Sequence, residues 1–181
     1  MNALAPYIWQ LFWAWLLQVL LFRHGVLWGG TGLFVVHLYG LMNMPSGWPP
    51  TAYLLVAAFM GASLDILCLT GGMHLAAAAT LGMAYPSLMA AVEPRDGFRP
   101  GHAINPHEDG WMSYLMLAAS STTLYLLVLF GLQHGWTLMG RTLVQTLASV
   151  ALNLVVFMLF QGLLNRPNRH KGSGPNAYPW S

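Results

Sequence analysis

Charged side chains are so scarce in this chain that it cannot fold as an ordinary water-soluble domain. Only 7% of its 181 residues are charged, whereas 56% are hydrophobic. A soluble domain carries about 25% charged residues, which cover its water-facing surface. The composition therefore predicts an integral membrane protein. The formal net charge of +2 is too small to indicate a nucleic-acid partner.

Six apolar segments are separated by polar residues or by glycine and proline. They cover approximately Pro6–Phe22, Gly32–Met44, Pro49–Cys68, Met73–Val92, Trp111–Gln133 and Leu138–Asn165. We therefore expect an all-α fold, in which residues 1–165 form a polytopic membrane bundle of about six transmembrane helices. Residues 166–181 are expected to form a polar, flexible cytoplasmic tail.

The second segment, Gly32–Met44, is short for a helical span, which needs about 20 residues. It could recruit Val26–Gly30, or it could enter the membrane only partly. Two arrangements are therefore open. We favour six full spans, and the alternative is five spans plus a re-entrant segment.

The basic residues predict how the bundle is oriented. An even number of spans places both termini on one side. Five basic residues lie on that side: Arg95, Arg99, Arg166, Arg169 and Lys171. Only Arg23 and Arg141 lie on the other. Because cytoplasmic loops are enriched in Lys and Arg, we expect both termini in the cytoplasm. No basic residue precedes the first apolar run, so a cleavable signal peptide is not expected.

Asp65 is the only acidic residue within an apolar segment. A carboxylate at the bilayer centre costs roughly 2.5–3.5 kcal/mol, so it needs a partner, a cavity or headgroup water. His74 follows it across the Gly71-Gly72 turn and is the nearest candidate partner. Two interpretations are open. The pair could be a functional site, or the carboxylate could brace the turn by bonding to the imidazole or to backbone N–H groups, and we favour the brace.

Small and polar residues at helical spacing indicate which segments pack together. Ala57, Gly61 and Asp65 recur every fourth residue in the third segment, and Ala78 and Gly82 do so in the fourth. Small residues let membrane helices approach closely, so these two segments are expected to form a tight hairpin.

The first and last segments each carry a stripe of polar residues. Gln145, Ser149 and Asn153 recur every fourth residue in the last segment, and Gln10 and Gln18 lie on one face of the first. Such stripes either join helices or line a solute pathway. We favour joining, because neither stripe contains a charge.

The sequence predicts neither catalysis nor a metal or cofactor. The single cysteine, Cys68, excludes an internal disulfide and a CxxC site. The seven histidines show no HxxxH, HxH or HExxH spacing. The serines lack a GxSxG or SxxK setting, so no nucleophile is recognisable.

A loop of dense turn formers follows the fourth segment, from Glu93 to Gly101. Its Asp96-Gly97 and Pro100-Gly101 pairs are turn dipeptides. It could be a solvated connector, or it could be a structured cytoplasmic docking element in which the turns fix where Arg95 and Phe98 point.

Several of these residues together form a recognisable pattern along most of the chain, from about Leu17 to Gly162. The pattern comprises Gly61-x3-Asp65, Gly72-x-His74-x-Ala76, Tyr85 and the loop Pro94-Arg95-Asp96-Gly97-Phe98-x-Pro100-Gly101. It resembles the rod shape-determining protein MreD family, especially the form associated with Bacteroidetes-type bacteria.

The resemblance implies an inner-membrane subunit of the cell-wall elongation machinery. Members of that family associate with the bitopic protein MreC, and they influence the RodA-type peptidoglycan polymerase, its transpeptidase and the actin-like MreB filament. The family offers no catalytic residues to transfer. Matching positions are therefore expected to serve structure or interaction: Gly61, Asp65, Gly72, His74, Arg95, Asp96, Gly97, Phe98 and Pro100.

Two functions follow as hypotheses. The first is a non-catalytic scaffold that holds the single transmembrane helix of an MreC-like partner. The second is the substrate-binding membrane component of a vitamin-type transporter, which predicts a closed outward pocket lined by Asp65, His74 and nearby tryptophans.

Overall fold

The computed structural model describes residues 5–20, 26–27, 32–95, 97–135 and 138–164. Asp96 and the tail at 166–181 lie outside the described residues. Within the described ranges, four helices are long and apolar enough to cross a membrane. They are α3 (Pro50–Cys68), α4 (Met73–Val92), α6 (Trp111–His134) and α7 (Met139–Leu164). These four match the third to sixth segments expected from the sequence to within two residues at each end.

The first expected segment forms a helix as well. Helix α1 (Ala5–Leu20) has 16 residues, which corresponds to a length of about 24 Å. This is shorter than the roughly 30 Å of the hydrocarbon core.

The expected helical span at Gly32–Met44 is wrong. Strand β2 (Gly32–Leu33) pairs antiparallel with β1 (Val26–Leu27), and an extended stretch then leads into α2, which covers only His37–Met42. Six residues of helix measure about 9 Å, far less than a bilayer. A bundle of six helical spans is therefore not confirmed.

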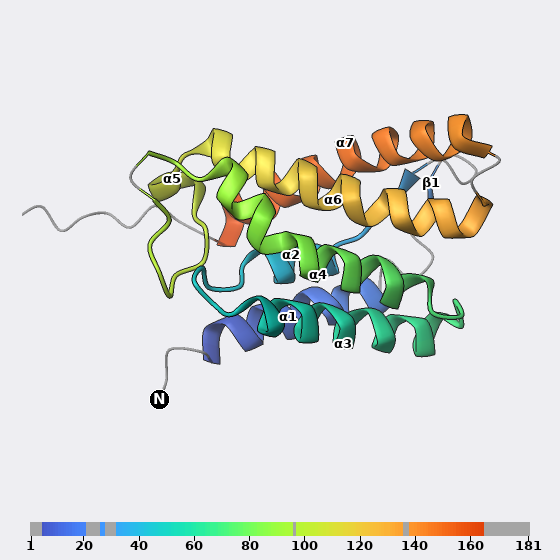
Figure 1. Cartoon of the computed structure of the whole chain (residues 1–181), viewed down its shortest axis with the longest axis horizontal. Helices are drawn as coiled ribbons and strands as arrows, with labels where there is room; N and C mark the ends of the chain where they lie inside the picture. Colours follow the sequence, from blue (N-terminus) through green and yellow to red (C-terminus); the bar gives the residue numbers. More distant parts are fainter. Residues whose placement is uncertain (1–4, 21–25, 28–31, 96, 136–137, 165–181) are drawn as a thin grey trace, which may run out of the picture.

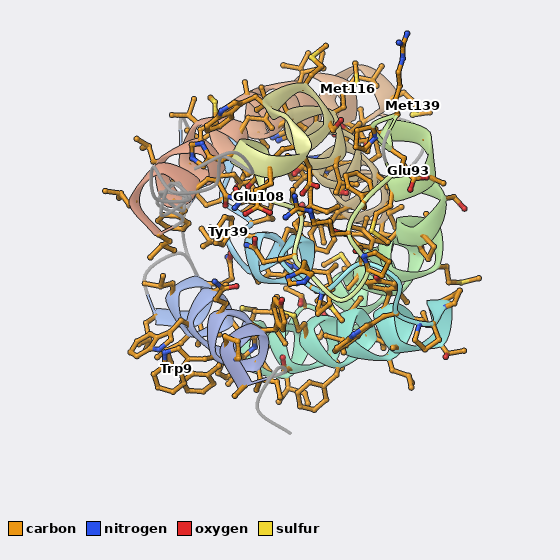
Figure 2. All side chains as sticks on the ribbon, turned by 90° about the vertical axis from the view of Figure 1, so that its left-hand side faces the viewer. Trp9, Tyr39, Glu93, Glu108, Met116 and Met139 are labelled. Carbon is orange, nitrogen blue, oxygen red and sulfur yellow. The ribbon has the colours of Figure 1, made fainter. Side chains whose placement is uncertain are left out.

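This irregular segment lies inside the protein. Every residue from 35 to 46 is buried. Figure 2, which looks along the bundle, shows α2 in the middle of the section, with α1, α3, α4, α6 and α7 around it. Non-helical backbone is tolerated at membrane depth only where protein or a water-filled cavity surrounds it, so the position of the segment explains how it can be irregular.

Side chains of α7 and α1 satisfy the backbone of the extended stretch. Ser149 Oγ accepts from Leu33 N at 2.9 Å, and Asn153 Oδ1 accepts from Val35 N at 2.8 Å. Asn153 Nδ2 donates to Leu33 O at 2.8 Å. Gln18 Nε2 on α1 donates to Phe34 O at 3.0 Å. Gln18 of one stripe and Ser149 and Asn153 of the other thus join segments of the fold, as the favoured interpretation predicts for these residues.

Two tyrosines complete the support of the central segment. Tyr85 OH donates to Met42 O at 3.1 Å, and Tyr53 OH donates to Pro45 O at 2.6 Å. Carbonyls at a helix C-terminus have no intrahelical donor, so a buried Met42 carbonyl needs such a partner. Both tyrosine side chains are fully buried.

The hairpin of α3 and α4 is as tight as its small residues predict. A Cβ on Gly61 would lie 2.5 Å from His74 O, and one on Gly82 would lie 2.8 Å from Leu54 Cα. Each helix therefore places a glycine directly against the backbone of the other, so neither position accepts a side chain without moving the helices apart.

The two ends of the bundle differ. Helix α1 begins and α7 ends at the same end, which also carries the loop after α4 and the short helix α5 (Pro106–Asp109) (Figure 1). The turn between α3 and α4 lies at the opposite end (Figure 1). The residues singled out by the sequence are consequently divided between these two ends.

Candidate functional site

Asp65 lies in the last turn of α3 and acts on the first turn of α4. One carboxylate oxygen accepts from the hydroxyl of Thr70 and from His74 N at 3.0 Å. The other accepts from Leu75 N at 2.7 Å. His74 and Leu75 are the second and third residues of α4, whose N–H groups an N-cap side chain normally satisfies.

The local sequence explains why the carboxylate must come from another helix. The N-cap position of α4 is Gly72, which has no side chain. Gly71 and Gly72 both have positive φ, at +65° and +92°, which glycine adopts without strain. The chain therefore reverses within a few residues and brings the end of α3 beside the start of α4. Asp65 has the geometry of the brace with backbone N–H groups, which was one of the two open interpretations.

The His74 imidazole has its own hydrogen-bond partner, on α6. Its Nδ1 lies 2.6 Å from Tyr125 OH on α6. Behind this pair lies His37 of α2, which is fully buried, with its ring centroid 5.2 Å from that of Tyr125. His37 Nδ1 lies 3.4 Å from Gln18 Oε1 on α1. A layer of polar side chains from α1, α2, α4 and α6 therefore lies next to the Asp65 brace.

The sequence does not predict this layer. His37 and Tyr125 are separated from their partners by 19 and 51 residues. Neither forms a spacing motif with them. Only the placement of a histidine in the middle of an apolar segment hinted that His37 has polar partners.

A cavity of about 210 Å³ opens beside the polar layer, and we call it the turn cavity. Its lining includes Gln18, Cys68, Thr70, His74 and Gln133. The transporter hypothesis predicted a pocket lined by Asp65, His74 and tryptophans. Of these, only His74 lines the turn cavity among the residues that the structure describes.

A second hollow, of about 560 Å³, lies between α1 and α7, and we call it the lateral groove. Helix α1 contributes Trp9, Gln10, Trp13, Ala14 and Leu17, α2 contributes Tyr39, and α7 contributes Phe160, Leu163 and Leu164. Figure 2 shows Tyr39 on the side of α2 that faces the space between α1 and α7. The groove is thus lined mostly by apolar side chains, and its α1 wall is aromatic.

The α1 wall of the groove carries two exposed tryptophans. The Trp9 side chain is 60% exposed and that of Trp13 is 44% exposed. Their rings meet edge to face, with centroids 5.5 Å apart. Large exposed aromatic side chains of this kind are typical anchors of protein interfaces.

The loop after α4 is a structured element at the other end of the bundle. Ser46 O accepts from Gly101 N at 2.9 Å, Ser46 N donates to His102 O at 2.9 Å, and Ser46 Oγ donates to Arg99 O at 2.6 Å. Phe98 packs against the hydrophobic core, and Glu93 accepts from its N–H at 3.3 Å.

The motif residues of the loop after α4 differ in their surroundings. Gly97 has φ of +75°, which favours glycine at this turn, and Pro100 packs beside Gly47. Arg99 forms an ion pair with Glu108 at 2.8 Å. Arg95 is exposed, and Asp96 lies outside the described residues. The loop therefore exposes the Arg95 side chain at this end of the bundle, and its later part is bonded to Ser46.

The positions that carry the family resemblance do not converge on one site. Gly61, Asp65, Gly72 and His74 build the α3–α4 hairpin, whereas Arg95, Gly97, Phe98 and Pro100 belong to the loop at the opposite end (Figure 1). Comparisons of the chain with protein-family models, with curated proteins and with solved structures find no match.

Proposed function

We propose that this chain is a non-catalytic scaffold and regulatory subunit of the bacterial cell-wall elongation machinery, an MreD-like protein of the inner membrane. In this proposal it binds the single transmembrane helix of an MreC-like bitopic partner. A RodA-type polymerase, its transpeptidase and MreB are further proposed partners of the same assembly. The lateral groove is the observation that carries the proposal.

The shape of the groove suits a helix. Trp9, Trp13 and Leu17 recur every fourth residue on α1, so this wall runs along the helix axis for about 12 Å. Phe160, Leu163 and Leu164 form the facing wall on α7. Since lipid tails give no hydrophobic reason for association, helices in membranes bind through close van der Waals packing, which a trough between two helices provides.

The proposal includes six passes of the chain and a cytoplasmic position for both termini. Helix α1 and the buried segment at 32–46 would add two passes to the four long helices. The common end of α1 and α7 supports an even number of passes (Figure 1). Arg95 and Arg99 lie at that same end, and enrichment of basic residues supports its cytoplasmic placement.

Site-specific photo-crosslinking in cells tests the groove. A photoreactive amino acid at Trp13 or Leu163, one on each wall, should crosslink to a bitopic membrane protein. The matched control is Met83 on α4, which is 68% exposed and is not part of the groove. It should give no such product.

Two results would contradict the proposal. The first is no bitopic partner at either groove position. The second is equal crosslinking at Met83, which would place the contact on another face. A reporter fusion checks orientation separately: green fluorescent protein at the C-terminus should fluoresce, and alkaline phosphatase there should be inactive.

A further inference from the structure

The lining of the turn cavity combines polar and apolar side chains. Its polar members include the Cys68 thiol, the partly buried His74 imidazole and the exposed Gln133 amide. A small polar ligand in the cavity can hydrogen-bond to these groups. Leu33, Leu64, Met73 and Leu129 provide apolar walls around them.

A second layer of side chains fixes the positions of the polar lining. Thr70 donates to Asp65, and His74 Nδ1 bonds to Tyr125 OH at 2.6 Å. Gln18 is held by Phe34 O at 3.0 Å, and its Oε1 lies 3.4 Å from His37. Apolar walls with a few fixed polar groups are the usual construction of a small-molecule site.

The charged residues around the cavity restrict which ligands it can bind. No Lys, Arg, Asp or Glu among the described residues lines it. Both oxygens of the nearest carboxylate, Asp65, are already occupied by three donors. Among the described residues, the lining therefore offers an ionised ligand no permanently charged partner to offset its lost hydration, which favours an uncharged ligand.

We propose that the turn cavity is a binding site for a small uncharged molecule, of the size of one aromatic ring with an amide-like hydrogen-bonding group. Its volume of about 210 Å³ is below the roughly 300–1,000 Å³ of drug-sized pockets, which sets this upper size. The proposal does not depend on the scaffold function, because the cavity and the lateral groove share no lining residue within the described ranges.

Cys68 provides a native reporter, since it is the single cysteine of the chain and lines the cavity. The whole protein in lipid nanodiscs is treated with methyl methanethiosulfonate, and the rate of Cys68 modification is followed by mass spectrometry. The probes are benzamide, which has the proposed chemistry, and benzoate, which has the same shape and a charge. Benzamide at 20 mM should slow modification about threefold, for a dissociation constant near 10 mM that is normal for so small a ligand. Benzoate should leave the rate unchanged.

Two variants test whether the lining is responsible. His74→Phe keeps a ring but removes the nitrogens, and Gln133→Leu removes an exposed amide of the lining without touching the Asp65 brace. Both should abolish protection by benzamide. His102→Phe, in the loop at the opposite end, is the control and should keep it.

The proposal is overturned if Cys68 does not react at all, if benzamide gives no protection, or if benzoate protects equally. It is also overturned if benzamide still protects in the Gln133→Leu protein. Because the readout is the rate at one cysteine and not partner binding, failure here leaves the scaffold proposal standing.

Discussion

Asp65 illustrates how an acidic residue is retained in an apolar segment. Its carboxylate lies beside the N-terminus of α4, where N–H groups have no intrahelical acceptor and the helix dipole favours negative charge. The sequence predicted that the acid needs a partner, and backbone N–H groups were one of the alternatives. It could not predict that the His74 ring turns to Tyr125, because the 51 residues between them leave no spacing signal.

Replacing Asp65 tests the brace. Asp65→Asn removes the charge and one of the two acceptor oxygens that receive N–H and O–H donors. We expect it to lower the free energy of unfolding by about 1–2 kcal/mol, as loss of a helix cap does, while the folded fraction still binds the proposed partner. Thermal unfolding in detergent, followed by tryptophan fluorescence, measures the change.

Glu108→Gln is the control for that experiment. It breaks the exposed ion pair with Arg99, which contributes about 0–1 kcal/mol. If Asp65→Asn unfolds like wild type but no longer binds the partner, Asp65 serves function and the brace is wrong.

At the scale of elements, the α3–α4 hairpin was predictable because its signal is local. Small residues every fourth position mark a face on each helix, and the Gly71-Gly72 turn forces the two helices together. The two close approaches at Gly61 and Gly82 follow from that pattern.

Substitution of these glycines should separate the helices. In Gly61→Ala and Gly82→Ala the new methyl group meets backbone atoms at 2.5–2.9 Å, and backbone cannot rotate away. We expect a loss of about 1–3 kcal/mol in each, typical of overpacking. Gly162→Ala on α7 is the matched control, since its Cβ would meet nothing within 4 Å, and it should be neutral or slightly stabilising. Equal changes in stability at all three glycines would show that helix propensity, and not close packing, causes the effect of the substitutions.

The segment at 32–46 was not predictable in the same way. An apolar run of this length is compatible with a buried helix and with a buried extended chain, and periodicity does not separate them. The extended conformation depends on Ser149 and Asn153, which lie more than 110 residues away in the sequence. Their side chains replace the missing backbone hydrogen bonds.

We therefore expect the Asn153 side chain to contribute strongly to the stability of the fold. Asn153→Leu leaves Val35 N–H and Leu33 C=O without these partners, and each unsatisfied buried group costs about 1–3 kcal/mol. Thr142→Val, also buried on α7, removes a hydroxyl that has no partner in the described part of the chain, so it should be neutral or stabilising. Chemical denaturation of both variants measures the contrast. A stable Asn153→Leu protein would show that the extended stretch does not depend on α7.

At the scale of the whole molecule, the positions of the family resemblance separate into a hairpin at one end and a loop at the other. The sequence predicted the residues of both, but their separation emerges only when the direction of each helix is known (Figure 1). The later part of the loop is fixed to the bundle, because Arg99, Gly101 and His102 bond to Ser46. The Arg95 side chain is exposed in the earlier part of the loop.

Arg95 allows the loop to be tested apart from the bundle. Arg95→Glu reverses the charge of an exposed side chain, so the apparent Tm should stay within about 1 °C of wild type, as for most surface changes. Binding to the proposed cytoplasmic partners in a pull-down should fall. Arg141→Glu, at the opposite end, is the matched control and should not affect binding. A melted Arg95→Glu protein would mean that this residue supports the fold and not an interaction.

The dependence of residues 33 and 35 on Ser149 and Asn153 has a consequence for biogenesis. A ribosome delivers the early segment to the bilayer long before α7 has been translated. Until then its extended backbone lacks acceptors and donors that hydrocarbon cannot supply. Maturation must therefore wait for the last helix, and a nascent chain truncated before Ser149 should be recognised by membrane proteases as incomplete.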